Sequence, residues 1–141
     1  MKILILCTGN SCRSQMAHGF MQSFDPRLEV YSAGVSPAYR VAPEAVEVMA
    51  EKGIDISGQR PHDVREYLDV SFDYVITVCD HANENCPFFS GEVKKRLHFP
   101  FPDPYHARGG HEAVMRVYRE VRDAIEIKFN DLYEYEIKAK L

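Results

Sequence analysis

The chain has 141 residues, of which 45% are hydrophobic and 27% are charged, and its formal net charge is −4. This composition predicts one globular domain, residues 1–141, that buries roughly 68–70% of its unfolded surface. The sequence shows no basic stripe and no apolar run of ~18 residues, so neither nucleic acid nor a membrane is expected as a partner.

The N-terminal segment, residues 1–7, combines a short apolar run with no cleavage site of small residues. It is therefore predicted to form a first strand over residues 2–6 rather than a secretion signal. A continuously apolar strand is typical of a parallel sheet that is covered on both faces. We accordingly expect a cytoplasmic protein, in which four cysteines more often serve catalysis, redox chemistry or metal binding than structural disulfides.

Residues 13–24 are predicted to form the first helix. Met16, Phe20 and Phe24 recur at every fourth position, so they lie on one face of an amphipathic helix. Residues 28–32 alternate between apolar and polar side chains, which is the pattern of an edge strand.

Similar signals predict the remaining elements in this order: a helix over 43–53, a weaker helix over 62–69, a buried strand over 74–78, a short alternating strand over 97–101 and a helix over 111–132. Pro43 opens the first of these helices and Gly53 closes it, which is the usual asymmetry. The charged run within 116–128 is expected to be a solvated helix face. The polar tail at 133–141 is expected to be a frayed helix end.

Strands that alternate with helices predict an α/β fold of three layers, in which four parallel strands form one open sheet with helices on both faces. In such folds ligands bind beyond the carboxyl ends of the strands. Cys7, Cys79 and Asp103 each follow a predicted strand. We therefore expect these three reactive side chains to meet at one edge of the sheet.

The loop between the first strand and the first helix has the composition of an oxyanion site. It runs from Cys7 into a helix N-terminus, where unpaired N–H groups and the helix dipole favour an anion. The same field can lower a cysteine pKa from ~8.5 to ~3.5–7.5, so Cys7 is predicted to be a nucleophilic thiolate. Arg13 adds a planar fork that grips two oxygens. The predicted oxyanion-binding residues are Thr8, Gly9, Asn10, Ser11, Cys12, Arg13 and Ser14.

Individual side chains of this loop have distinct expected roles. Gly9 lets the backbone turn so that successive N–H groups converge, and Asn10 holds the shape of the loop. Ser11 and Ser14 are expected to donate their hydroxyl groups to the sulfur or to the loop backbone. The chain has neither a Walker loop nor the pattern G-x-G-x-x-G, and it lacks a second segment that would support a flavin-phosphate loop.

Two further cysteines, Cys79 and Cys86, follow the strand over 74–78. Their thiols can take oxidising equivalents from Cys7 by thiol–disulfide exchange. Together with the oxyanion loop, they indicate nucleophilic attack on a tetrahedral oxyanion that is coupled to this exchange. Zinc is an alternative, but six intervening residues differ from the usual two to four between zinc ligands, so no metal site is predicted. The role of Cys12 stays open.

These motifs resemble a known family. A cysteine, five residues and then Arg13-Ser14 near the N-terminus are similar to the low-molecular-weight protein tyrosine phosphatases. Other segments resemble more particularly the thioredoxin-coupled arsenate reductases of that fold, namely Ser14–Ala17, Tyr31–Gly34, Gly53–Ser57, Cys79–Pro87 and Phe101–Pro104. The resemblance covers nearly the whole chain, about residues 3–130.

The resemblance implies a sequence of reactions. Cys7 attacks arsenate while Asp103 protonates the departing oxygen. Cys79 then attacks Cys7, which releases arsenite, and Cys86 resolves the resulting bridge as a Cys79–Cys86 disulfide that thioredoxin reduces. Helical geometry would hold the last two cysteines ~10 Å apart, which is too far for a bond, so the segment 79–92 is expected to loop out or unwind during turnover.

The chain departs from the reductase pattern in two places. Tyr105 follows the Asp-Pro pair, as it does in the phosphatases, where many reductases have a small residue. His18 stands where some reductases present a glutamate that helps to bind potassium, so a potassium site built from Asn10 and Ser32 stays an open question. No other cofactor is expected, because thioredoxin supplies the electrons.

Three functions follow, in this order. The first is thioredoxin-dependent reduction of arsenate, for which phosphate or sulfate would be mimics. The second is hydrolysis of phosphotyrosine or aryl phosphates, which requires Cys7, Arg13 and Asp103 but neither Cys79 nor Cys86. The third is a redox-switch protein whose disulfide controls binding. We expect a monomer, because a small domain of this kind requires no partner to fold.

Overall fold

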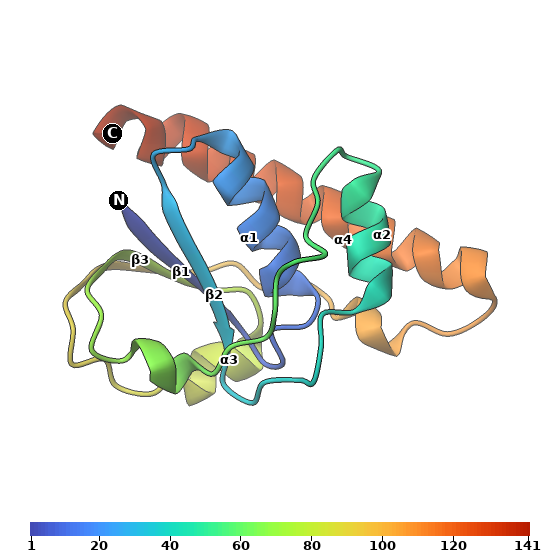
Figure 1. Cartoon of the computed structure of the whole chain (residues 1–141), viewed down its shortest axis with the longest axis horizontal. Helices are drawn as coiled ribbons and strands as arrows, with labels where there is room; N and C mark the ends of the chain where they lie inside the picture. The colour runs from blue at the N-terminus through green and yellow to red at the C-terminus, as the bar shows by residue number, and fades with distance from the viewer.

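A single sheet of four parallel strands, in the order β2-β1-β3-β4, forms the centre of the computed structural model, which describes residues 1–141 (Figure 1). The strands are β1 (Lys2–Cys7), β2 (Glu29–Gly34), β3 (Phe72–Thr77) and β4 (Val93–His98). Because β1 pairs with β2 on one side and with β3 on the other, its residues Ile3–Leu6 are fully buried. The predicted parallel sheet and the edge position of β2 are confirmed.

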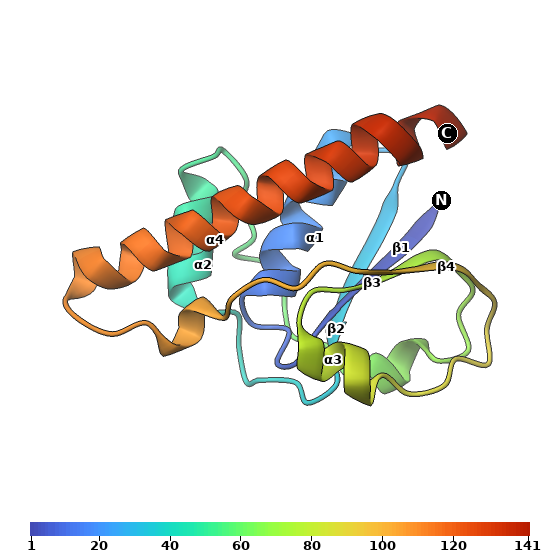
Figure 2. The same cartoon turned by 180° about the vertical axis from the view of Figure 1, so that it is seen from behind.

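Helices cover both faces of the sheet, as the sequence predicts. They are α1 (Arg13–Phe24), α2 (Pro43–Ala50), α3 (Asp80–Asn85) and α4 (His111–Leu132). Figures 1 and 2 show α1, α2 and α4 gathered on one face, whereas α3 lies on the other. A short 3-10 turn, Val64–Tyr67, replaces the helix predicted over 62–69. None of the helices combines the length and the apolar composition that crossing a membrane requires.

The apolar faces of α1 and α4 pack into the main core. Met16 and Phe20 of α1, and Ile125 and Phe129 of α4, are at most 1% exposed. Helix α2 ends close to its predicted boundary, where Gly53 takes a left-handed conformation with φ at 74°. The periodicity of the sequence therefore predicts the large helices correctly.

Helix α3 lies within the segment 79–92, in which the sequence predicts no regular element and a change of conformation during turnover. Its sequence is polar and only Ala82 is buried, so no apolar period marks it. A helix of this length is marginal by itself and depends on tertiary contacts. The helix begins directly after Cys79 and ends directly before Cys86, so it determines how far apart these two thiols lie.

Strand β4 lies earlier in the chain than the strand predicted over 97–101. Its segment 94–96 is basic and exposed at the edge of the sheet, so apolar alternation does not reveal it. Phe99 and Phe101 still donate their N–H groups to the carbonyls of Thr77 and Val78. Pro100 between them has no N–H, and the regular ladder ends before it.

The prediction of a frayed tail is wrong. The chain continues after α4 as a π-helical turn, Tyr133–Ile137, and a 3-10 turn, Lys138–Lys140. Ile137 is fully buried, and the Tyr133 hydroxyl donates to Asp25 Oδ2 at 2.8 Å. The tail is anchored because Tyr133 and Ile137 enter the core and Glu136 accepts hydrogen bonds from Tyr74 and Lys95 of the sheet.

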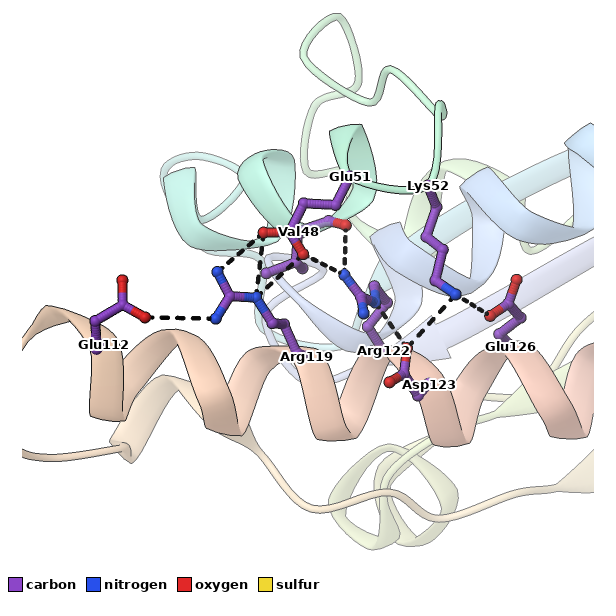
Figure 3. A network of polar contacts seen from close by, with 8 residues as sticks. All are labelled: Val48, Glu51, Lys52, Glu112, Arg119, Arg122, Asp123 and Glu126. Carbon is purple, nitrogen blue, oxygen red and sulfur yellow. Dashed lines mark hydrogen bonds and ion pairs between the residues drawn. The ribbon is translucent and has the colours of Figure 1, made fainter.

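The charged run on α4 is also more than a solvated face, because it ties this helix to α2 (Figure 3). Arg122 is 7% exposed, and its Nη1 donates to the carbonyl of Val48 at 2.9 Å and to Glu51 Oε1 at 2.6 Å. Arg119 also binds Glu51, with its Nη2 at 3.0 Å from Oε2. The carbonyls in the last turn of α2 need such donors, because they have no partners within the helix.

Candidate active site

The predicted convergence of Cys7, Cys79 and Asp103 is confirmed at the carboxyl edge of the sheet. Cys7 ends β1, Cys79 lies two residues after β3 and Asp103 five residues after β4. A cleft of about 640 Å³ opens there. The loop of Cys7–Arg13 lines it, together with residues 38–44 and the segment of Asp103, Tyr105 and His106.

Asn10 fixes the shape of the oxyanion loop, as expected. It is fully buried, and its φ of 52° lies in the left-handed region. Its Oδ1 accepts the N–H of His62 at 2.9 Å, and its Nδ2 donates to Ser14 Oγ at 2.7 Å. Gln15 Nε2 in turn donates to the Asn10 carbonyl at 2.9 Å. These bonds offset the cost of the left-handed backbone and hold the loop against the start of α1.

Gly34 gives the same loop its support from the next strand. A Cβ atom at this position would lie 2.5 Å from the carbonyl oxygen of Thr8, which is closer than real contacts allow. The N–H of the residue that follows, Val35, donates to the carbonyl of Cys7 at 3.2 Å. The loop therefore rests directly on the backbone at the end of β2.

Arg13 lies between the loop and the acidic segment after β4. Its Nη1 donates to the carbonyl of Phe101 at 3.0 Å, and its Nη2 lies 3.4 Å from Asp103 Oδ2. Its Nε is buried and has no hydrogen-bond partner. A buried donor without a partner is costly in a folded protein, so it marks a place where a bound anion would supply the acceptor.

The thiols of Cys7 and Cys79 are neighbours at the carboxyl ends of the adjacent strands β1 and β3, and each changes the pKa of the other. The interaction with Cys79, together with burial, raises the pKa of Cys7 far above its ordinary value, against the opposing effect of Arg13. The interaction with Cys7, helped by the Thr8 hydroxyl and the Ala82 N–H, lowers the pKa of Cys79 to about 5. The two thiols therefore titrate together, so the predicted thiolate belongs to the pair rather than to Cys7 alone.

Two further groups besides Cys7 lie close to the Cys79 sulfur and help to lower its pKa. The Thr8 Oγ1 lies 3.2 Å from the sulfur, and the Ala82 N–H donates to it over 3.4 Å as part of the N-cap of α3. Thr8 is a predicted loop residue, but the sequence gives no sign that its side chain turns toward Cys79. That contact depends on the spatial neighbourhood of β1 and β3.

Neither Cys79 nor Cys86 lines the cleft, and Cys86 is the predicted catalytic residue that lies apart from the others. It is partly buried at the far end of α3, and burial raises the pKa of its thiol. All four cysteines are free thiols. Helical geometry spaces Cys86 ~10 Å from Cys79, whereas bonded cysteines have Cα atoms ~4.4–6.8 Å apart.

Two loop side chains differ in their contacts from the expectation. The Ser11 hydroxyl donates to the carbonyl of Arg40 at 3.0 Å, so it does not serve the Cys7 sulfur. Cys12 lies with its Sγ 3.7 Å from the hydroxyl of Tyr118, and burial raises the pKa of its thiol to about 11. This thiol is therefore a poor nucleophile beside Cys7.

Asp103 faces the cleft from the turn that follows β4. Its Oδ1 accepts the N–H of Tyr105 at 3.0 Å, while its Oδ2 faces Arg13 and lies 3.8 Å from the ring of His106. The side chain is 34% exposed, so it can exchange protons with water. Asp103 thus caps a turn and also presents a carboxyl group to the oxyanion loop.

The second wall of the cleft is a part of the site that the sequence does not reveal. Tyr39 is fully exposed there, and Tyr105 opposite is 66% exposed. The segment around Tyr39 has no regular secondary structure and no apolar period. Backbone bonds to the loop hold it in place: the N–H groups of Ala38 and Ala42 donate to the carbonyls of Gly9 and Ser11 at 2.8 and 3.0 Å.

A smaller polar pocket of about 160 Å³ lies behind the oxyanion loop, lined by residues that include His18, Ser32 and His62. His18 Nδ1 lies 2.9 Å from Ser32 Oγ, and Asn10 already binds its neighbours as described. The side chains considered for potassium therefore have protein partners. No group of three or more histidine, cysteine, aspartate or glutamate side chains is arranged to hold a metal ion.

We predict that His18 makes stability depend on pH. Burial, and secondarily His62, lowers the pKa of His18 to about 4 from 6.5. Between these pH values the unfolded chain binds a proton at His18 that the folded chain does not bind. The contribution of His18 to the free energy of unfolding is therefore fully present above pH ~6.5 and is lost as the pH drops toward 4. Urea unfolding at pH 4.5 and 7.5 measures how much free energy of unfolding each protein loses between the two pH values. We expect His18→Gln to lose about 2 kcal/mol less than the parent. The exposed variant His111→Gln serves as the control, and an equal loss in all three proteins would contradict the prediction.

The fold and the site define a phosphatase-like enzyme, with Cys7, Arg13 and Asp103 together in one cleft at the carboxyl edge of a parallel sheet. The chain belongs to the family of low molecular weight phosphotyrosine protein phosphatases, whose sequence profile matches residues 2–141.

Relatives and solved structures extend over nearly all of the chain. An "Arsenate reductase" of Halalkalibacterium halodurans is 45% identical over 124 residues, which are 87% of this chain and 88% of the relative. A solved structure described as an arsenate reductase in the phosphate binding state is 30% identical, with a TM-score of 0.79 over 94% of this chain and 96% of the other. A low molecular weight protein tyrosine phosphatase from T. tengcongensis is 27% identical, with a TM-score of 0.80 over 95% and 98%.

Proposed function

We propose that this chain reduces arsenate to arsenite through a relay of three cysteine thiols. The observation that carries the proposal is the position of Cys79 beside Cys7: the two residues lie at the carboxyl ends of adjacent strands, and Thr8, the neighbour of Cys7, has its Oγ1 3.2 Å from the Cys79 sulfur. Hydrolysis of a phosphate ester requires one thiolate, an arginine and an acid, and a second reactive thiol beside the nucleophile has no role in it. A second thiol is required where the first must leave as part of a disulfide.

In the proposed first step, arsenate binds to the N–H groups of the loop and to Arg13, whose unpaired Nε supplies a further donor. The proton of the Cys7 thiol moves to Cys79, and the Cys7 thiolate attacks the arsenic atom. An As–S bond forms while an As–O bond breaks, and Asp103 gives the departing oxygen its proton. The product is an arsenic(V) adduct on Cys7.

In the second step, Cys79 gives up the proton that it took in the first step, which leaves on an oxygen of the departing arsenite, and the resulting thiolate attacks the sulfur of Cys7. An S–S bond forms and the As–S bond breaks, so its electron pair stays on arsenic, which leaves as arsenite. Two electrons have then passed from two thiols to arsenic. Thr8 and the Ala82 N–H favour this step, because they stabilise the Cys79 thiolate before it attacks.

In the third step, the Cys86 thiolate attacks Cys79 and frees Cys7 for the next cycle. Because α3 holds the two sulfurs apart, it must unwind for this bond to form. A dithiol protein then reduces the Cys79–Cys86 disulfide, and we propose thioredoxin for this role. The electrons come from thiols, so the scheme requires no bound redox cofactor and no potassium.

The setting of the reaction follows from the same chemistry. A relay of free thiols operates in a compartment that keeps cysteines reduced, and we therefore place it in the cytoplasm. All groups in the scheme belong to one chain, so a monomer suffices.

Hydrolysis of aryl phosphates is a second candidate activity, and the size of the cleft favours it. A tetrahedral oxyanion fills only a small part of about 640 Å³, and the exposed rings of Tyr39 and Tyr105 flank the remainder. Such rings could contact an aromatic leaving group. This activity would use Cys7, Arg13 and Asp103 and would not oxidise any thiol.

Counting thiols against arsenate tests the main proposal. We expect the fully reduced chain to lose two thiols for each arsenate added, and mass mapping to find the bridge between Cys79 and Cys86. Arsenite release should become catalytic when thioredoxin, its reductase and NADPH are supplied. Phosphate in place of arsenate is the control and should oxidise no thiol. An unchanged thiol count after addition of arsenate would refute the proposal.

A further inference from the structure

The structure assigns a role in the relay to a chain of polar side chains that runs from the sheet to α3, formed by Asp80, His98, Thr77 and Asn83 and called here the α3 latch. We propose that the α3 latch holds the helix folded while the thiols are reduced, and that its release controls formation of the Cys79–Cys86 disulfide. The inference rests on the proposed function for its place in turnover, although the latch itself can be tested without arsenate.

The α3 latch consists of three close contacts. Asp80, the first residue of α3, has its Oδ1 at 2.8 Å from His98 Nε2. The other ring nitrogen of His98, Nδ1, lies 2.8 Å from Thr77 Oγ1 at the end of β3. The Thr77 hydroxyl also lies 3.3 Å from Asn83 Oδ1, to which it donates. The α3 latch therefore contacts α3 at its first and fourth residues.

These contacts matter because α3 has little else to hold it. It is six residues long, and Ala82 is its one buried residue. The other side-chain hydrogen bonds of this helix stay within it, between Asn85 and His81. A helix this short does not persist in water without tertiary support. The bonds of the α3 latch are thus the side-chain hydrogen bonds that join α3 to the sheet.

The position of the latch connects it to the chemistry. Asp80 follows Cys79 directly, and Cys86 follows the helix at its other end. As long as the helix stays folded, ~10 Å separates the Cα atoms of the two cysteines, and no disulfide can form. Opening the latch breaks the hydrogen bonds at both Asp80 and Asn83. The free energy of the α3 latch is therefore part of the cost of forming the disulfide.

Asp80 and His98 are therefore positioning residues. Neither contacts the oxyanion loop: His98 ends β4 and Asp80 begins α3. They act through the helix on the distance between two sulfurs. Their removal should therefore change the equilibrium and the rate of the last thiol exchange, and leave the first attack on the oxyanion largely unchanged.

The test measures the redox equilibrium of Cys79 and Cys86 directly. In a chain carrying Cys7→Ser and Cys12→Ser, these are the two remaining thiols. The protein is equilibrated with mixtures of reduced and oxidised dithiothreitol, the oxidised form accepting the two electrons and two protons of the dithiol. Alkylation and mass spectrometry then give the fraction of disulfide at each ratio.

We expect Asp80→Ala and His98→Leu each to form the disulfide about threefold to tenfold more readily than the same background with the latch intact. The double variant should show less than the product of the two effects, because both remove the same contact. Glu84→Ala is the matched control, since it removes another carboxylate from α3 that is exposed and makes no side-chain contact. It should leave the equilibrium unchanged.

A kinetic experiment in the chain with all four cysteines places the effect in turnover. After one equivalent of arsenate, the variants should convert the Cys7–Cys79 bridge to the Cys79–Cys86 bridge about threefold to tenfold faster, while loss of the Cys7 thiol keeps its rate. If Asp80→Ala, His98→Leu and the parent background are half oxidised at the same ratio of oxidised to reduced dithiothreitol, the α3 latch is overturned. An equal shift of this ratio in Glu84→Ala would overturn it as well. If the parent instead fails to oxidise with arsenate, the proposed function fails, and the equilibrium with dithiothreitol still decides the latch.

Discussion

Replacing Cys79 with serine is expected to abolish arsenite release while leaving the nucleophile in place. Without the second thiol, the adduct on Cys7 has no sulfur to displace it, so turnover should fall by at least about 10³-fold. Cys86→Ser should fail one step later, after a single turnover that leaves a Cys7–Cys79 bridge. Arsenite measured in the presence of the thioredoxin system, with mass mapping of the trapped bridge, distinguishes these two outcomes.

The phosphatase reading makes the opposite prediction for the same variants. Hydrolysis of p-nitrophenyl phosphate would depend on Cys7 and fall to background in Cys7→Ser, but it would fall much less in Cys79→Ser. Arsenite release that persists at the parental rate in both Cys79→Ser and Cys86→Ser would exclude the relay. Rapid ester hydrolysis without any oxidation by arsenate would then favour the second candidate activity.

Replacing Arg13 with lysine is expected to lower kcat/KM for arsenate by about 10²–10³-fold, although the positive charge is kept. The guanidinium donates to the Phe101 carbonyl, pairs with Asp103 and has one further donor, Nε, that is without a protein partner. An ammonium group is a point charge and cannot serve these directions together. The initial rate of arsenate-dependent thiol loss at several concentrations of arsenate measures the effect.

Arg40→Lys is the matched control for this experiment. Arg40 lines the same cleft but is exposed, and its part in the site is the backbone carbonyl that accepts from Ser11. Its side chain should therefore be replaceable with a change of no more than about twofold. Phosphate should inhibit the parent and Arg40→Lys at similar concentrations, and Arg13→Lys only at higher ones. Parental kinetics in Arg13→Lys would remove arginine from the proposed mechanism.

Much of the site can be predicted from the sequence because it lies where local patterns are strongest. A continuously apolar strand, a loop that starts with Cys7 and an amphipathic helix each have a clear signature. Parallel topology then brings the ends of the strands to one edge, which is why Cys7, Cys79 and Asp103 meet as expected. Asn10 also takes the role in the loop that its residue type indicates.

Other features have no local signature. Helix α3 is polar and short, the tail after Leu132 is polar, and β4 is basic at the edge of the sheet, so burial periodicity describes none of them. What holds them is long-range: the bonds of His98 to α3, the burial of Ile137 and the pairing of β4 with β3. A pattern that measures burial cannot detect an element that depends on a few distant polar contacts.

The sequence by itself therefore determined the parallel α/β scaffold and the meeting of Cys7, Cys79 and Asp103 at one edge of its sheet. The tertiary structure alone decided how the charge is distributed among them. Cys7, and to a smaller extent Thr8 and the first turn of α3, lower the pKa of Cys79, and Cys86 is kept away by the same helix. The reason is physical, since a thiol's residue type fixes its chemistry while its pKa and its reach depend on neighbours from other elements.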